Sequence, residues 1–250
     1  MSTGPHPGGL EEPPDPAAPR IESARVSRMF AGIARRYDRA NRVLSLGADV
    51  YWRWRTVRRV AARNPETVAD LATGSGDIAL ALRRRLPAGV SVVGLDFCGE
   101  MLEIARRKAG AGAKVVFRDG DCLDLPLADS SVDVCTIGFG LRNLEDRVRG
   151  LREMLRVLRP GGTLIVLEFS QPFPVLRPFY YFYLEKVLPR IAARITGDVD
   201  AYRYLGGTIG AFPDRAVLAE ELSSAGFERV DATPMTGGIV ALHQGFKPAR

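Results

Sequence analysis

A glycine turn between an apolar run and a helix-like pattern is the first place where this sequence predicts ligand chemistry. Residues 68–82 read VADLATGSGDIALAL, and the six residues that begin at the first glycine satisfy the G-x-G-x-x-A fingerprint of dinucleotide-binding turns. The candidate ligand-binding residues of the turn are Gly74, Ser75 and Gly76. Nicotinamide cofactors and S-adenosylmethionine both carry an adenosine that such a turn can hold, so the fingerprint alone leaves both open.

Acidic residues around the turn favour S-adenosylmethionine. Asp96 closes the next apolar run, twenty residues after Gly76, where a carboxylate can accept hydrogen bonds from a ribose diol of either ligand. Asp70 precedes the turn, and an acid there suits a cationic ammonium group better than a pyrophosphate, which it would repel. Asp121 and Cys122 stand where they can bind the adenine amine and cover the base. A purely structural acid that caps the turn is the alternative for Asp70.

Strand-like and helix-like patterns alternate from residue 67 onward and must position these side chains. Strands are predicted at 67–72, 90–96, 114–120, 132–140 and 162–170, helices at 78–86, 99–109, 146–158 and 214–227, and a hairpin-like strand pair at 228–246. Such alternation predicts an α/β, doubly wound, mostly parallel sheet with helices on both faces. With the final strand pair, the pattern resembles class I S-adenosylmethionine-dependent methyltransferases, a Rossmann-like fold whose seventh strand is antiparallel.

Composition divides the chain into three parts. Residues 1–20 are rich in proline and glycine, which predicts a disordered tail. Residues 21–66 are predicted to form an N-terminal helical cap, because aromatic and apolar residues at helical spacing interleave with many arginines. Residues 67–250 would form the methyltransferase domain. Within it, the aromatic segment 171–212 interrupts the alternation and is predicted to be a helical insertion before strand six, on the substrate side.

Charge and cysteine content limit the class of protein. The formal net charge is +6 and the pI about 9.5, and residues 20–63 alone carry twelve arginines against three acids. This balance favours an anionic partner or a solvated helix face. The three cysteines lack the spacing of a disulfide framework or a zinc cluster, so no metal is expected. Neither a secretory signal nor a membrane span is evident, so a cytoplasmic protein, peripheral at most on the inner face of the cell membrane, is expected.

Segments outside the glycine turn resemble the ubiquinone/menaquinone biosynthesis C-methyltransferase family, over about residues 27–248. The segments are FAGIARRYDRANRVLSLG (30–47), FGLRN (139–143), DVDAYRYLGGTI (198–209) and GGIVALHQGFK (237–247). Departures from the family pattern are Ser75 for threonine, Gly138 for serine at a cofactor contact, and Asp121-Cys122 for Asn-Ala. The sequence lacks the N-P-P-Y-like turn of base-amine methyltransferases, and Cys135 lies inside a strand, so no nucleic-acid substrate is expected.

The resemblance implies methylation of a ring carbon on a polyprenylated hydroquinone. That carbon is a poor nucleophile until a neighbouring hydroxyl loses its proton, so the reduced quinol must be the substrate. Arg142 is expected to stabilise the oxyanion, directly or through a water, with Asn143 orienting it. The alternative role for Arg142 is a surface ion pair, and that for Asn143 is a helix N-cap. His243 is a candidate general base, and packing is its alternative.

Aromatic residues complete the predicted site. Tyr37 is expected to cover the cofactor, and Phe139, Tyr202 and Tyr204 to line the quinol cavity, with core packing as the alternative for the tyrosines. Demethylmenaquinol is the expected substrate, and the polyprenyl-methoxy-benzoquinol of ubiquinone synthesis or another small lipid or aromatic compound is the alternative. A cofactor-binding assembly subunit without turnover is a third possibility. A polyprenyl substrate further implies transient contact with the membrane surface, and a homodimer is possible.

Overall fold

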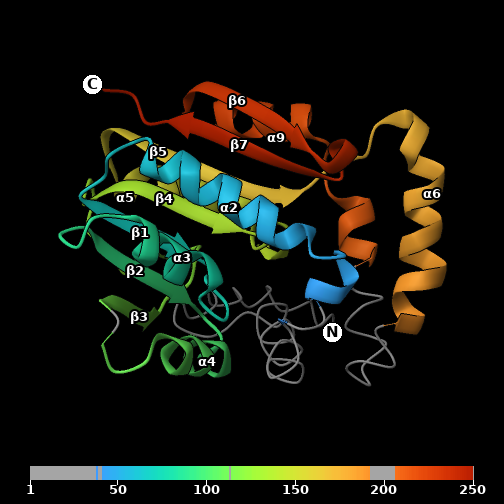
Figure 1. The fold of residues 1–250 in the computed structure, drawn as a ribbon. Helices are drawn as coiled ribbons and strands as arrows, with labels where there is room; N and C mark the ends of the chain where they lie inside the picture. The colour runs from blue at the N-terminus through green and yellow to red at the C-terminus, as the bar shows by residue number, and fades with distance from the viewer. Residues whose placement is uncertain (1–37, 39–40, 113, 192–205, 250) are drawn as a thin grey trace, which may run out of the picture.

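A computed structural model describes residue 38 and residues 41–112, 114–191 and 206–249 of the chain. Its centre is one seven-stranded sheet of order β3-β2-β1-β4-β5-β7-β6 (Figure 1). The strands are β1 (Thr67–Leu71), β2 (Ser91–Asp96), β3 (Val115–Asp119), β4 (Val132–Gly138), β5 (Leu158–Phe169), β6 (Glu228–Met235) and β7 (Val240–Phe246). Neighbours among β1 to β5 pair in parallel, whereas β7 runs antiparallel to both β5 and β6. The predicted fold class is confirmed.

Two helical layers cover the sheet. Helices α2 (Ala48–Ala61), α3 (Asp77–Arg85) and α4 (Gly99–Ala109) contribute to the apolar core on one face. Helices α5 (Arg147–Val157) and α9 (Arg215–Ser224) enclose a second core on the other. Both of these begin at an aspartate, Asp146 or Asp214, whose side chain accepts hydrogen bonds from backbone N–H groups of the first turn.

Strand β5 begins earlier than its apolar pattern predicts. Its pairing with β4 starts at Val132 and Leu158, and resumes at Val134 and Thr163 after an irregularity that accommodates the RPGG segment. The predicted strand started at residue 162, because proline and two glycines resemble a turn. In the sheet these residues are extended instead, and Gly161 has a positive φ.

The segment after β5 is helical, as its pattern predicts. It comprises η2 (Pro174–Leu176), α6 (Arg177–Phe182) and the π-helical η3 (Tyr183–Val187), and the helix continues to residue 191. Figure 1 shows this helix, labelled α6, on the side of the molecule toward which the parallel strands point. Residues 206–211 are also helical.

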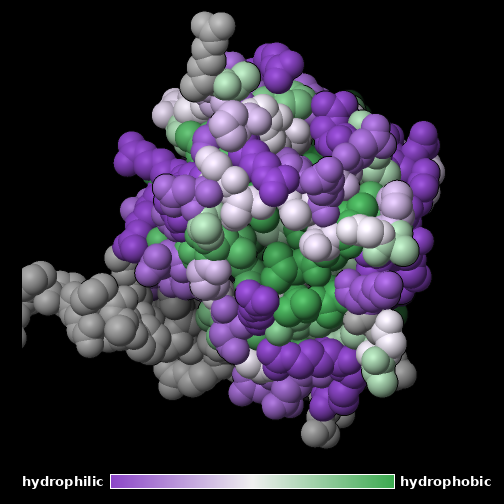
Figure 2. Space-filling view, turned by 90° about the vertical axis from the view of Figure 1, so that its left-hand side faces the viewer, coloured by the Kyte–Doolittle hydropathy of each residue, from purple (hydrophilic) through white to green (hydrophobic). Residues whose placement is uncertain are grey.

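The surface of the opposite side is mixed in character. Figure 2 views the molecule from the amino ends of the parallel strands and shows hydrophobic residues in a central hollow, surrounded by hydrophilic ones. No helix in the described part of the chain has the length and apolar character needed to cross a bilayer.

Candidate active site

The glycine turn lies at the carboxyl end of β1, where the strand order of the sheet reverses. Chain connections leave β1 toward β2 on one side and enter β4 on the other, and ligands of open α/β sheets bind at such a switch point. Gly74 and Gly76 both have positive φ, at 55° and 81°. A Cβ on Gly76 would lie 2.9 Å from both the Ala105 Cβ and the Phe117 Cζ, so only glycine lets α3 begin this close to α4 and β3.

Asp96, at the end of β2, stands directly beside this turn. Its Oδ2 accepts a hydrogen bond from the Gly74 N–H at 2.7 Å, and its Oδ1 accepts one from the Cys98 N–H at 2.9 Å. Burial raises the pKa of the carboxyl group, and the nearby Asp119 acts in the same direction. The sequence thus places a carboxylate and a glycine turn together, and the carboxylate retains lone pairs for a ligand diol.

Asp70, at the end of β1, is surrounded by hydrogen-bond donors of the protein itself. The residue is buried, and its carboxylate accepts hydrogen bonds from the Thr73 and Thr136 hydroxyl groups, both at 2.6 Å, and from the Ala79 N–H at 3.1 Å. Burial raises its pKa to about 6. With three donors around it, Asp70 joins β1, β4 and the start of α3, as its structural alternative expects, and its contact with an ammonium group stays a prediction.

Ser75 is buried and forms part of a small polar cluster at the turn. Its hydroxyl donates to Asp38 at 2.6 Å and accepts from the Lys108 ammonium group at 3.0 Å. Lys108 also pairs with Asp38 at 2.8 Å and with Asp77. These contacts fasten the glycine turn to α4 and to residue 38, in the segment that precedes α2.

Asp121 and Cys122 follow β3 near the same edge of the sheet. Asp121 is exposed, and its side chain accepts a hydrogen bond from the Leu123 N–H at 2.8 Å. Cys122 is buried, and burial together with the charges of Asp96 and Asp121 raises the pKa of its thiol to about 12. The thiol therefore stays protonated and is suited to packing rather than nucleophilic attack. Cys135 is also buried in the core, as its strand position predicts.

Arg142 lies in the turn η1 (Leu141–Asn143) after β4 and is held by a buried ion pair. Its Nη1 is 2.9 Å from the Glu168 Oε1, and the two side chains are only 4% and 0% exposed. Nη1 also donates to the Phe139 carbonyl, and the Arg142 N–H donates to the Glu168 Oε2 at 3.2 Å. The guanidinium carbon lies 5.2 Å from the centre of the Phe169 ring. The predicted alternative of a surface ion pair does not fit this burial.

Three buried polar side-chain atoms, in η1 and just after the end of β5, have no hydrogen-bond partner among the described residues. They are the Arg142 Nε, the Asn143 Oδ1 and the Ser170 Oγ. The Asn143 amide makes one long contact, 3.5 Å to the Phe139 carbonyl, and it is Asp146 that caps α5. Buried polar groups are rarely left unpaired, so a donor and two oxygens at this edge are available to a polar ligand.

An aromatic wall adjoins these polar atoms. The Phe139 ring centre lies 4.9 Å from that of Phe169 and 5.9 Å from that of Trp52. Phe139 has a φ of 58°, a strained value for a non-glycine residue. A Cβ on Gly138 would lie 2.4 Å from the Ile78 Cδ1, so the serine expected there would require this side chain to move. Phe139 thus packs against Phe169 and Trp52, and its place in the lining of a quinol cavity stays a prediction.

Two residues of this region were not predicted. Glu168 is a single acid in an apolar run of the sequence. Its isolation could have indicated a buried carboxylate with a charged partner, since a buried carboxylate needs one. Tyr180 on α6 is the other. Burial raises the pKa of the Tyr180 hydroxyl and the Arg142 guanidinium acts in the opposite direction, so the two side chains are within electrostatic reach.

His243, the predicted general base, has a buried Nδ1 with no hydrogen-bond partner among the described residues. It lies within β7, paired with Val166 of β5, and is fully buried with its Nε2 2.9 Å from the Arg215 carbonyl oxygen of α9. Burial lowers its pKa. A base must reach the substrate proton directly or through one water. His243 instead packs between the sheet and α9. Tyr37, Tyr202 and Tyr204 lie outside the described residues.

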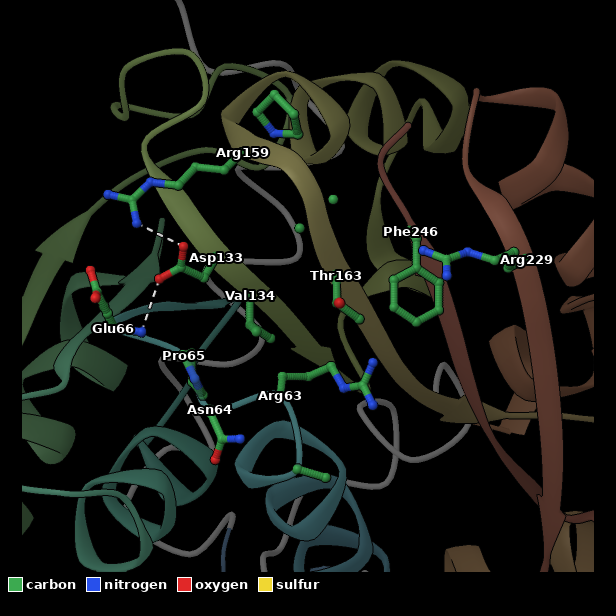
Figure 3. Close-up of a pocket in the computed structure, with 14 residues that line it drawn as sticks. Arg63, Asn64, Pro65, Glu66, Asp133, Val134, Arg159, Thr163, Arg229 and Phe246 are labelled. Atoms are coloured by element: carbon green, nitrogen blue, oxygen red, sulfur yellow. Dashed lines mark hydrogen bonds and ion pairs between the residues drawn. The ribbon is translucent and has the colours of Figure 1, made fainter. Parts of the chain in front are cut away.

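A cavity of about 640 Å³ opens at the opposite end of the sheet (Figure 3). Its lining includes Arg63, Arg159 and Arg229, and it includes none of the predicted site residues. Arg63 and Arg229 stack near the Phe246 ring, at 5.6 and 4.1 Å from its centre. Because ligands of this architecture bind at the carboxyl ends of the strands, this cavity is separate from the candidate active site.

Comparison with known proteins agrees with this geometry. The sequence profile of the ubiE/COQ5 methyltransferase family matches residues 19–247. The ubiquinone/menaquinone biosynthesis C-methyltransferase UbiE of Geobacter sp. (strain M21) is 41% identical over 227 residues, which cover 89% of this chain and 96% of that protein. The demethylmenaquinone methyltransferase of Thermus thermophilus is 46% identical over 225 residues, which cover 88% of this chain and all of that protein.

Solved structures share the fold at lower sequence identity. A Thermotoga maritima S-adenosylmethionine-dependent methyltransferase, described as a possible histamine N-methyltransferase, matches with a TM-score of 0.61 and 20% identity. The match covers 88% of this chain and 99% of that one. At this identity the likeness supports the fold alone.

Proposed function

Because this chain belongs to the ubiE/COQ5 methyltransferase family, S-adenosylmethionine-dependent C-methyltransferases of menaquinone and ubiquinone biosynthesis, we propose that it methylates demethylmenaquinol to menaquinol. Relatives named demethylmenaquinone methyltransferase are 43–46% identical to it, and those named for both quinones are 40–41% identical. These names favour the naphthoquinol, and the methoxy-benzoquinol is the second candidate.

The residues around the glycine turn fit the methyl donor. When bound, S-adenosylmethionine supplies an electrophilic methyl group. Asp96 would accept hydrogen bonds from the ribose hydroxyl groups, and the backbone of the turn at Gly74 and Gly76 would lie against the methionine part. Asp121 and the protonated Cys122 thiol would contact the adenine. The fit depends on the positive φ of Gly74 and Gly76, which shapes the turn, and on the Asp96 carboxylate beside it.

The buried guanidinium of Arg142 is the observation on which the proposed acceptor site depends. A quinol carbon becomes nucleophilic only as the neighbouring hydroxyl loses its proton, so negative charge develops on that oxygen. Arg142 keeps its positive charge at any physiological pH and has an unpaired Nε, so it can stabilise this oxyanion. It is a poor base for the same reason.

Asn143 and the aromatic wall would orient the quinol. The unpaired Asn143 Oδ1 can accept a hydrogen bond from the quinol hydroxyl or from a water that carries its proton away. The rings of Phe139 and Phe169 can pack against the flat naphthalene system. These contacts would also speed the reaction by holding the ring carbon in line with the methyl group of the donor.

Turnover of labelled S-adenosylmethionine tests this proposal. Demethylmenaquinol and the matching benzoquinol should be offered separately, both kept reduced, with product masses measured. We expect a single added methyl group on the naphthoquinol and a lower kcat/KM on the benzoquinol. Faster turnover of the benzoquinol would replace the proposed substrate. Methylation of neither quinol, with retained donor binding, would refute the function.

A further inference from the structure

The helix formed by residues 174–191 exposes an unusual set of side chains along its outer face. Val175, Phe179 and Phe182 are 79%, 76% and 62% exposed, and they are followed along the same face by the exposed Lys186 and Arg190. The spacing of four, three, four and four residues is that of one helical stripe. Large apolar side chains this exposed are ordinarily scattered singly, whereas here they adjoin one another.

The inner face of the same helix is packed against the protein. Leu184 and Leu188 are buried, and Tyr180 is half-buried within electrostatic reach of Arg142. The Tyr183 hydroxyl donates to the Leu44 carbonyl at 2.7 Å. Because the inner face is anchored in this way, the outer apolar stripe cannot be buried by a rotation of the helix.

The start of the helix is held as well. The Leu176 Cδ1 approaches the backbone at Gly237, where a Cβ would lie 2.2 Å away, and a Cβ at Gly238 would lie 3.1 Å from the Phe173 ring. Arg215 stacks on Phe173, 5.5 Å from the ring centre. The stripe is therefore presented by a firmly seated element, at the edge of the molecule toward which the parallel strands point (Figure 1).

We propose that the outer stripe formed by Val175, Phe179, Phe182, Lys186 and Arg190 docks on the surface of an anionic lipid bilayer. Aromatic and aliphatic side chains with basic residues beside them are the combination that inserts at a lipid interface and pairs with anionic headgroups. The exposed helix also carries Arg177 and only one acid, Glu185. A second copy of this chain is a poorer occupant, since an identical stripe contains no acidic residue to pair with Lys186 and Arg190.

This surface gives the proposed active site access to a membrane-bound substrate. The helix that would touch the bilayer also carries Tyr180, which is within electrostatic reach of Arg142. A polyprenyl quinol could then enter past this helix with its chain still in the lipid. The access route rests on the function proposed above, whereas lipid binding by the stripe does not.

Co-sedimentation with vesicles tests the docking surface. The vesicles are phosphatidylcholine alone or with about one third phosphatidylglycerol. We expect the full chain to bind the anionic vesicles more strongly, and Phe179→Ser with Phe182→Ser to weaken partitioning at least tenfold. Lys186→Gln with Arg190→Gln should remove most of the preference for anionic vesicles. If the full chain fails to bind vesicles, or the Phe179/Phe182 variant binds them equally well, the proposal is wrong.

Two controls separate this result from other causes. Val148→Ser with Val217→Ser alters apolar residues on α5 and α9 that are 48% and 45% exposed, and it should leave vesicle binding unchanged. Sedimentation velocity should give the same oligomeric state for the full chain and the Phe179/Phe182 variant. A dimer that this variant dissolves, with vesicle binding unaltered, would assign the stripe to a second copy instead.

Activity on two substrates distinguishes a failure of this proposal from a failure of the proposed function. The Phe179/Phe182 variant should methylate a water-soluble, short-chain quinol at the normal kcat and lose turnover on a long-chain quinol embedded in vesicles. Equal turnover of both substrates by this variant would overturn the access route. If the unaltered chain methylates neither quinol, the proposed function fails while the sedimentation result still decides the docking surface.

Discussion

The buried pair of Arg142 and Glu168 should show strong energetic coupling. The side chains of Arg142 and Glu168 are only 4% and 0% exposed, and the Arg142 Nη1 lies 2.9 Å from the Glu168 Oε1. At an effective dielectric constant of about 20, charges about 4 Å apart attract by about 4 kcal/mol. Removing one partner leaves the other charge buried and uncompensated, so Arg142→Met and Glu168→Gln should each lower the free energy of unfolding by about 3–5 kcal/mol. The double variant leaves no buried charge, and it should be more stable than either single variant.

Urea unfolding measures the loss of stability, and steady-state kinetics measure the loss of turnover. Arg147→Met is the matched control, because Arg147 and Glu221 form a pair 2.8 Å apart that is 34% and 23% exposed, and its loss should cost at most about 1 kcal/mol. Arg142→Met and the double variant should keep donor affinity but lose about 10²–10³ in kcat, as for other lost oxyanion donors. Losses of stability that simply add in the double variant would refute the coupling. Normal turnover by either variant would refute the oxyanion role.

Four further substitutions test individual positions of the site. Asp96→Ala should weaken donor binding in calorimetry about 100-fold, by loss of charged hydrogen bonds worth about 1.5–3 kcal/mol each, and retained tight binding would contradict the ribose assignment. Because burial raises the pKa of Asp70 to about 6 from 3.8, ionisation costs stability, and the unfolding free energy should fall by about 3 kcal/mol as the pH rises from about 4 to about 6. Asp70→Asn should flatten that dependence in urea titrations, and an unchanged slope would contradict it. Gly76→Ala should cost about 2–4 kcal/mol of unfolding free energy through its positive φ and its 2.9 Å contacts, whereas Gly89→Ala, with open space around it, should cost less than about 1 kcal/mol. His243→Gln should leave kcat and its pH profile within a few-fold of normal, and a drop of 100-fold or more would restore the general-base role.

The order of strands and helices could be predicted because local patterns determine it. Alternating apolar runs and amphipathic helices mark each βα unit, and the glycine turn marks the first of them. The position of Asp96 beside Gly74 could also be predicted, since neighbouring parallel strands end at the same edge of the sheet. The predicted start of β5 was wrong, because the RPGG segment has turn-like residues but pairing with β4 holds it extended.

The pairing of side chains could not be predicted, because it depends on strand register. Glu168 meets Arg142 only because β4 and β5 pair with Gly138 opposite Leu167, which brings residues 26 positions apart into contact. The contact of His243 with α9 could not be predicted for the same reason, since it depends on how β7 pairs with β5. For Asp70, the charge argument assumed an open carboxylate, and the donors that close it include Thr136 from another strand.

The carboxyl edge of the sheet divides into two halves of opposite electrostatic character. Asp96 at the end of β2 and Asp119 at the end of β3 stand on one side of β1, and they favour a positively charged ligand. Arg142 stands after β4 on the other side and favours a negatively charged one, while Glu168 balances it before the substrate's own charge develops. A sulfonium and a phenolate would each be stabilised in its own half. Because methyl transfer cancels both charges, the products would lose these interactions together, so the arrangement that favours the reactive ion pair also favours product release.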